Sequence, residues 1–205
     1  ALQNQINPHF LYNTLDTIRS YALMEDCSEV AEMTEALATM FRYNISKPGD
    51  MGSLREELDN VNNYFLIQKY RFGDKFHLSL EIDEEDERLK ECRLPRLSIQ
   101  PLVENALYHG IKLRRGLGCI LVDAAQEDDR VRITVRDDGA GMPPERLQQL
   151  RQSLDTEEQV GFGLRTVYRR LRLLYGEQCS MELESEPGAG TTVTLRFPIR
   201  KEAGA

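Results

Sequence analysis

The sequence predicts an α+β fold, in which a helical hairpin is followed by a two-layer α/β sandwich. From residue 2 to residue 72, apolar residues recur at the three- and four-residue spacing of amphipathic helices. From residue 76 onward, short alternating segments typical of strands are interleaved with helical segments. We therefore expect two regions, a helical one over residues 1–73 and an α/β sandwich over residues 74–200.

The helical region contains two breaks, one near residues 25–28 and one in the Pro- and Gly-containing stretch 46–53. Ser53 and Glu56 form a capping box, in which each side chain accepts from the other residue's backbone amide, and a further helix starts there. An apolar stripe on so few helices is hard to cover within one chain. We therefore expect a homodimer, paired through the N-terminal helices as a four-helix bundle.

The α/β region alternates strands and helices. Strand-like segments are 76–82, 119–126, 131–137, 180–186 and 191–199, and helical segments are 97–111, 143–154 and 164–175. The polar turn EDDR joins the second and third strands, and the last two strands form a closing hairpin. Strands and helices that each have one apolar face predict a sheet covered by a layer of helices.

Composition favours a soluble globular protein and excludes some classes of function. The 205 residues are 40% apolar, and the formal charge of −8 argues against a general nucleic-acid binder. The four cysteines lack metal-ligand spacing and are expected to be reduced in the cytoplasm. No run approaches the roughly 18 apolar residues of a membrane span. Because the chain opens with Ala1 already in helical pattern, we expect a cytoplasmic piece of a longer protein.

The first candidate site is the segment VRDDGAGM at residues 135–142. A strand that ends in Asp137 and runs into Gly139 and Gly141 presents a carboxylate, followed by backbone that can approach a ligand closely. An Asp-Gly pair after a strand also forms ordinary turns, and a turn is the alternative explanation.

The second candidate is VGFGL, in which Gly161 and Gly163 directly precede a helix. Free backbone amides at a helix N-terminus bind anions such as nucleotide phosphates, although an ordinary flexible loop fits the same residues. The polar stretch between the two glycine segments suits a mobile lid over a ligand.

The third candidate is QPLVENALYHG at residues 100–110, where Asn105 and His109 are four residues apart and are expected on one helix face. An Asn carbonyl oxygen can bind Mg²⁺, which would complete its shell with phosphate oxygens and water. A solvated face or a capped helix end is the alternative for this stretch alone.

In this order, LVENALYHG, DDGAG, GFGL and GAGTTVTLRFP resemble the N, G1 and G2 boxes of the GHKL ATP-binding fold, which histidine kinases share with gyrase. The resemblance implies ATP and Mg²⁺ as cofactors, with Asp137 on the adenine amino group, Asn105 on Mg²⁺ and Thr191 near the adenine. It also implies that Gly161 and Gly163 hinge the lid at the phosphates. The other residues that these motifs implicate in nucleotide binding are His109, Gly139, Gly141 and Leu164, with Glu104 in a supporting role.

The opening QINPHFLYNTLDTI, together with LREELDNVNNYFLIQKYRFGDKF, resembles the LytS-like sensor histidine kinases, whose phosphoacceptor helix carries Asn-Pro-His-Phe. This resemblance implies that His9 takes the γ-phosphoryl group of ATP and passes it to an aspartate of a response regulator receiver domain. It implies that Asn13, one helical turn later, positions the water that dephosphorylates the regulator. It further implies that a missing N-terminal sensor region attaches the parent protein to a bacterial membrane.

The chain departs from related patterns at three places, one of which is Thr166 in GLRT, where Asn is frequent and where the change could weaken nucleotide affinity. Phe10 follows the histidine, where better-known histidine kinases have an acid, so the acceptor of the imidazole proton is left open. Asp138 stands where the first glycine box often has Asn, which could weaken nucleotide affinity.

Pro8 raises a structural question, because the helical spacing continues through it. Inside a helix, a proline leaves one carbonyl without its partner, here that of Asn4, at a cost of about 3 kcal/mol. We therefore expect the helix to bend next to His9, which would change the accessibility of the imidazole.

Two other functions fit parts of the sequence. A GHKL ATPase that hydrolyses ATP would carry a general-base carboxylate four residues before Asn105, where this chain has Pro101. A nucleotide-gated binding module without histidine transfer would be indicated by the loss of His9 or Asn105, and both are present. The sequence thus favours transfer of a phosphoryl group to histidine.

Overall fold

The computed structural model describes residues 7–45, 50–83, 85–111, 116–154 and 162–199. The α-helices are α1 (Pro8–Met24), α2 (Ser28–Asn44), α3 (Leu54–Phe72), α4 (Glu87–Lys90), α5 (Gln100–Asn105), α6 (Pro144–Ser153) and α7 (Phe162–Tyr175). The strands are β1 (Met51–Ser53), β2 (Phe76–Ile82), β3 (Arg93–Pro95), β4 (Gly118–Glu127), β5 (Arg130–Asp137), β6 (Ser180–Glu186) and β7 (Gly190–Pro198). No helix of the described residues is both long enough and apolar enough to cross a bilayer.

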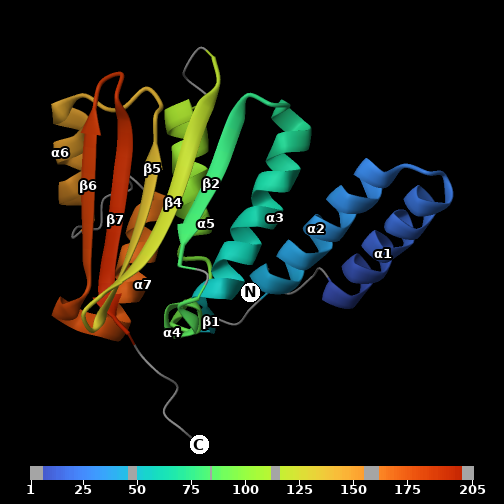
Figure 1. Cartoon of the computed structure of the whole chain (residues 1–205), viewed down its shortest axis with the longest axis horizontal. Coiled ribbons are helices and arrows are strands. Elements are labelled where there is room, and N and C mark those ends of the chain that lie inside the picture. Colours follow the sequence, from blue (N-terminus) through green and yellow to red (C-terminus); the bar gives the residue numbers. More distant parts are fainter. Residues whose placement is uncertain (1–6, 46–49, 84, 112–115, 155–161, 200–205) are drawn as a thin grey trace, which may run out of the picture.

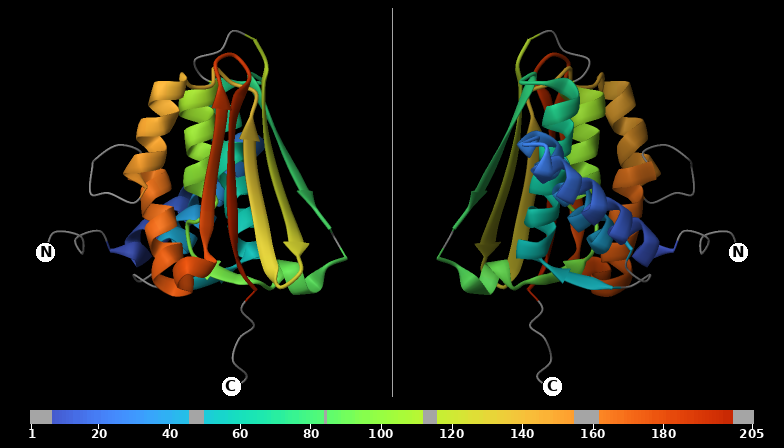
Figure 2. Two further views of the ribbon diagram at one scale, coloured as in Figure 1. Left: turned by 90° about the vertical axis from the view of Figure 1, so that its left-hand side faces the viewer. Right: turned by 90° about the vertical axis from the view of Figure 1, so that its right-hand side faces the viewer.

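Five strands form one mixed sheet in the order β2-β4-β5-β7-β6. β2 is parallel to β4, and the other neighbours are antiparallel. Helices α5, α6 and α7 cover one face, with α3 beside β2, and the opposite face is open (Figures 1 and 2). The predicted two-layer α+β architecture is therefore confirmed.

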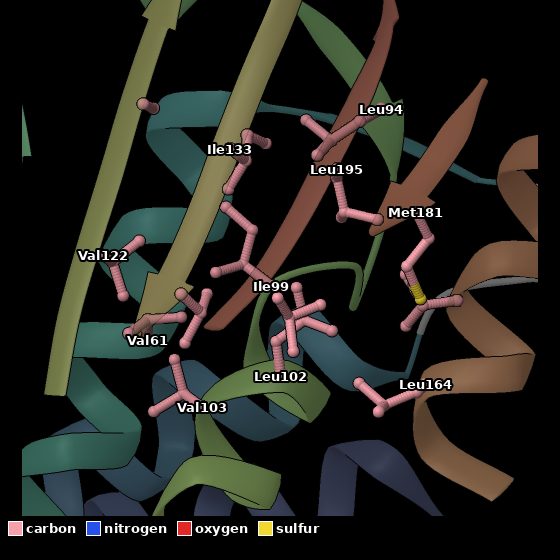
Figure 3. Close-up of a cluster of buried hydrophobic side chains, with 14 of the residues drawn as sticks. Val61, Leu94, Ile99, Leu102, Val103, Val122, Ile133, Leu164, Met181 and Leu195 are labelled. Carbon is pink, nitrogen blue, oxygen red and sulfur yellow. The ribbon is translucent and has the colours of Figure 1, made fainter. Parts of the chain in front are cut away.

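The alternating strand residues explain why the sheet has one covered face. Ile120 and Val122 of β4 point toward the helices and are almost fully buried. They pack in a core with residues from distant elements, including Ile133, Leu195 and Leu164 (Figure 3). The open face carries a network of ion pairs between neighbouring strands instead. Arg132 pairs with Asp123 and Glu127, and Arg196 pairs with Glu127 and Glu182.

The N-terminal helices pack in sequence, α1 on α2 and α2 on α3. Figure 1 shows the α1–α2 hairpin extending to the side of the sheet domain, with α3 between them. α3 also buries Leu54, Leu58 and Val61 in the core that the sheet shares. This helix therefore joins the hairpin to the sheet domain through packed side chains as well as through the chain itself.

The expected capping box at the start of α3 is confirmed. The Ser53 hydroxyl accepts from the Glu56 amide at 3.2 Å, and the Glu56 carboxylate accepts from the Ser53 amide at 2.8 Å. The expected break near residues 25–28 separates α1 from α2, and the expected break at 46–53 separates α2 from α3 and contains β1.

The expected bend at Pro8 is wrong, because Pro8 is the first residue of α1 rather than an interior one. Asn7 is the N-cap, with extended backbone (φ −67°, ψ 111°), and its side-chain oxygen accepts from the His9 amide at 3.0 Å. A proline at the first helical position loses no hydrogen bond, since that amide has no partner inside the helix. Asn4, whose carbonyl was expected to lose its hydrogen-bond partner, lies outside the described residues.

Candidate nucleotide site and exposed histidine

Asp137 ends β5 as a buried carboxylate, with only 3% of its surface exposed. It accepts a hydrogen bond from the Gly139 amide at 2.8 Å and another from the backbone of Thr191, its cross-strand partner on β7. Gly110 packs against it so closely that a Cβ there would lie 2.3 Å from Oδ1. Strand β5, strand β7 and the turn at Gly110 thus together fix this carboxylate.

Burial raises the pKa of Asp137 to about 6. This value already includes the opposing effect of the hydrogen bonds from Gly139 and Thr191, which lower the pKa, and the smaller raising effect of the negative charge of Asp138. Asp138 itself accepts from the Cys119 amide at 2.7 Å, which ties the turn after β5 to the start of β4. A carboxylate with this pKa is ionised at neutral pH and can accept hydrogen bonds from a ligand.

The glycines after Asp137 allow backbone segments to touch. A Cβ on Gly139 would lie 2.2 Å from the carbonyl carbon of Gly110, and Ala140 donates to the Gly110 carbonyl oxygen at 3.1 Å. Gly141 has φ 64°, and a Cβ there would lie 1.8 Å from the carbonyl oxygen of Glu186. These glycines therefore build the wall of the site around Asp137.

Ser185 of β6 is a member of this site that sequence reasoning missed. Its hydroxyl accepts from the Met142 amide at 2.9 Å, donates to the Gly190 carbonyl at 2.9 Å and lies 2.9 Å from the Thr191 hydroxyl. It fixes the turn after β5 to the start of β7. A serine at an alternating strand position carries no sequence signal for such a role.

Asn105, the last residue of α5, lies beside the first turn of α7. Its amide nitrogen donates to the Pro101 carbonyl at 2.7 Å, and a Cβ on Gly163 would lie 3.3 Å from that nitrogen. This orientation leaves the carbonyl oxygen, the type of ligand that Mg²⁺ takes, for other partners. No group of three or more His, Cys, Asp or Glu residues in the described chain could enclose a metal ion. The donors fit a Mg²⁺ ion held by one amide oxygen together with phosphate oxygens and water.

Glu104 is held from α3 through a relay of amides. The Asn60 amide donates to Gln100 at 2.7 Å, and the Gln100 amide donates to Glu104 at 2.7 Å. The relay attaches α5 to α3 next to Asn105.

The regular helix expected over residues 97–111 is wrong in its second half. α5 ends at Asn105, and Ala106–Gly110 form a π-helical turn. The wider turn brings Gly110 against Asp137, and π-turns of this kind are frequent at functional sites. His109 is exposed on this π-turn, and Asn105 is partly buried at the end of α5.

The remaining predicted nucleotide-binding residues fall in three different places. Thr191 lies opposite Asp137 on β7. Leu164 is buried in the core, where Figure 3 shows it among side chains of the sheet and α5. Gly161 and residues 155–160 of the expected lid lie outside the described residues, whereas the first part of that stretch forms α6.

His9 lies exposed in the first turn of α1. Its ring nitrogen Nδ1 is 3.3 Å from the Asn13 amide, as the one-turn spacing predicted. The structure does not bring His9 together with Asp137 or Asn105, because α2 and α3 lie between α1 and the sheet domain (Figure 1).

Comparison with known proteins gives two family models in sequence order. Residues 1–76 match the model described as histidine kinase, and residues 94–201 match that of histidine kinase-, DNA gyrase B- and HSP90-like ATPases. A solved histidine kinase domain from the Erythrobacter litoralis EL346 blue-light activated histidine kinase has the same fold, with a TM-score of 0.54 at 16% identity. The match covers 94% of each chain.

Curated relatives align over nearly the whole chain. It is 35% identical to the sensor histidine kinase YesM of Bacillus subtilis and 32% identical to the sensor protein LytS of the same species, over 98% of this chain in both cases. It covers 33% and 34% of those relatives, and thus spans about a third of their length. The motifs, the fold and these relatives agree, and the chain belongs to the LytS-like family of sensor histidine kinases.

Proposed function

We propose that this chain is the catalytic core of a two-component sensor kinase, which transfers the γ-phosphoryl group of ATP to His9 and then to an aspartate of a response regulator receiver domain. The observation that carries the proposal is one chain that holds both an exposed His9 with Asn13 beside it and a buried Asp137 framed by glycines. The matched ATPase model supports ATP as the nucleotide.

The nucleotide would bind between β5, β7 and the start of α7. Asp137 accepts from the adenine amino group, with Thr191 beside it, and Asn105 holds Mg²⁺ near Gly163 and the phosphates. The metal supplies positive charge for the phosphate oxygens, since phosphoryl transfer depends mainly on positioning and electrostatic stabilisation. The rival ATPase reaction lacks support, because Pro101 carries no carboxylate to activate water.

Asn13 would prepare the His9 ring for attack. With the side-chain amide rotated so that its oxygen, rather than the nitrogen now 3.3 Å away, faces Nδ1, Asn13 would accept a hydrogen bond from Nδ1–H, which leaves the lone pair on Nε2. Nε2 is therefore the proposed acceptor of the phosphoryl group. In a later step, the same amide would orient water for dephosphorylation of the regulator.

The transfer needs a second arrangement of the parts, since α2 and α3 separate His9 from the nucleotide site. Either the sheet domain moves against the hairpin, or a second chain supplies the nucleotide. A homodimer through α1 is supported by the exposed Phe10, Ile18, Tyr21 and Met24, which share one side of the helix. A sensor region preceding this sequence would attach the whole protein to the membrane.

The proposal is tested by incubation with Mg²⁺ and γ-labelled ATP. We expect label that survives alkali, is lost in acid and is absent from His9→Gln. His77→Gln, which alters an exposed histidine of β2, is the matched control and should be labelled like wild type. Phosphate release without labelled protein, unchanged in His9→Gln, would instead indicate an ATPase.

Nucleotide binding should weaken in acid. As the pH falls through about 6, Asp137 takes up a proton and loses an acceptor for the adenine amino group, so the Kd for ADP rises. Asp138→Asn removes a charge that raises the pKa of Asp137, and we expect the midpoint to move to lower pH. The Kd for ADP is measured by calorimetry from pH 5 to pH 8 for wild type and for Asp138→Asn, and the pH midpoints of the two Kd curves are compared. Protonation of the ADP phosphates affects both curves equally and cancels in this comparison. Equal midpoints would contradict this account.

A further inference from the structure

Glu57 is a buried carboxylate to which the proposed reaction gives no role. It lies near the start of α3, is fully buried, and accepts hydrogen bonds from the amides of Leu97 (2.6 Å), Ser98 (2.7 Å) and Ile99 (2.8 Å). The Tyr43 hydroxyl donates to it as well. Burying a carboxylate is costly unless such donors replace water. Two donors meet each oxygen, Leu97 and Tyr43 at Oε1, and Ser98 and Ile99 at Oε2.

The backbone of segment 97–99 is also held from its other side. Arg170 of α7 donates to the carbonyl oxygens of Arg96 and Leu97, each at 2.6 Å. Leu97 has φ 59°, a conformation that residues other than glycine rarely adopt unless their surroundings impose it. Glu57 and Arg170 therefore set the shape of this segment.

Segment 97–99 leads directly to Asn105. Ile99 is the N-cap of α5, and its amide, like others at a helix start, has no partner inside the helix. Glu57 supplies that partner from α3. Because α5 has only six residues, the place of Asn105 at its end follows from the place of its start. α7, which carries Arg170, also carries Gly163 beside Asn105.

Tyr43 connects the hairpin to the same cluster. Its hydroxyl reaches Glu57, and the Arg96 guanidinium lies 4.7 Å from the centre of its ring. Tyr43 belongs to α2, so the cluster joins the hairpin, α3 and the start of α5.

We propose that Glu57 is a positioning residue, which sets the place of Asn105 through segment 97–99 and is tied to the hairpin by Tyr43. The inference rests on the metal role proposed above for Asn105. Because β5 and β7 build the adenine end of the site, the effect of Glu57 is confined to the metal and phosphate end.

Glu57→Gln tests this proposal with binding measurements. The Gln side chain has the same shape, and its oxygen can keep the Ser98 and Ile99 amides while its NH₂ group opposes the Leu97 amide. The Kd of a non-hydrolysable ATP analogue is measured in excess EDTA and in excess Mg²⁺, and the ratio gives the contribution of the metal. We expect the Kd in EDTA to stay within about twofold of wild type and the ratio to fall about fivefold or more.

Tyr43→Phe tests whether the hairpin affects metal binding through Glu57. It also tests the positioning role of Glu57 if Glu57→Gln does not fold. It removes one donor, leaves three amides on Glu57, and should lower the same ratio by about two- to threefold. Tyr70→Phe is the matched control. It removes an exposed hydroxyl–carboxylate contact between the same two helices, 2.6 Å from Tyr70 to Glu32, and should leave the ratio unchanged.

The outcomes separate this inference from the proposed function. A wild-type ratio well above one that neither variant changes would overturn the inference alone. Equal weakening in EDTA and in Mg²⁺ would also overturn it, since the damage would then reach the adenine end. A wild-type ratio near one would refute the metal role of Asn105 and the inference with it.

Discussion

Asp137→Asn should abolish useful nucleotide binding without unfolding the protein. An amide at this position opposes a donor whichever way it turns, because its NH₂ group faces either the adenine amino group or the backbone amides that Asp137 now binds. An unpaired donor at a buried site costs about 1–3 kcal/mol, so we expect the Kd for ADP to rise by roughly 5- to 150-fold. Isothermal titration measures it, and a Kd within threefold of wild type would contradict the proposed role.

The stability of the same variant should behave differently from its affinity. The pKa of Asp137 is higher in the folded state than its ordinary value of 3.8. The folded state therefore binds the proton more tightly, stability falls as the pH rises through this range, and the ionised carboxylate opposes folding at pH 7. Asn does not ionise, so the free energy of unfolding of nucleotide-free Asp137→Asn at pH 7 should equal or exceed that of wild type. A large loss in urea denaturation would show that the carboxylate supports the fold.

Gly141→Ala should destabilise the sheet domain strongly. The new Cβ would lie 1.8 Å from the Glu186 carbonyl oxygen, and the backbone at φ 64° disfavours any side chain. Since the obstacle is backbone rather than a flexible side chain, the turn after β5 has to move away from β6. We expect the free energy of unfolding to fall by about 3 kcal/mol or more, measured by urea denaturation.

Gly188→Ala is the control for Gly141→Ala, because it introduces the backbone strain of a positive φ without a steric clash of the new Cβ. Gly188 also has a positive φ, of 80°, and its amide donates to Ala140 in the same region, but no atom lies within 4 Å of the position of a Cβ. It should cost only the strain, about 1–2 kcal/mol. Equal losses in the two variants would show that the contact at Gly141 contributes little.

Periodicity predicted most elements because it reports which side of a segment is buried. In β4, the buried residues Ile120, Val122 and Ala124 alternate with more exposed ones, and an apolar run of this length bounded by a polar turn predicted the strand. The site at the end of β5 was also predictable from sequence, because its carboxylate (Asp137) and its glycines (Gly139 and Gly141) are neighbours along the chain.

Features that depend on distant partners or on a local change of geometry were not predictable. Glu57 belongs to the charged run REEL, which reads as a solvated face, and its backbone partners lie about 40 residues away. The start of α1 was mispredicted from the helical spacing alone, although a local signal was present, since Asn7 followed by Pro8 is a typical N-cap and first helical residue. The π-turn before Gly110 is too short to leave a periodicity of its own.

The order of strands in the sheet has a consequence for synthesis. β7 follows β6 as the last of the described strands, yet it lies between β5 and β6, and it carries the residue opposite Asp137. While the ribosome still holds this strand, β5 lacks a neighbour and the adenine end of the site lacks one wall. We therefore expect the sheet domain to become competent to bind nucleotide only after β7 has emerged from the ribosome.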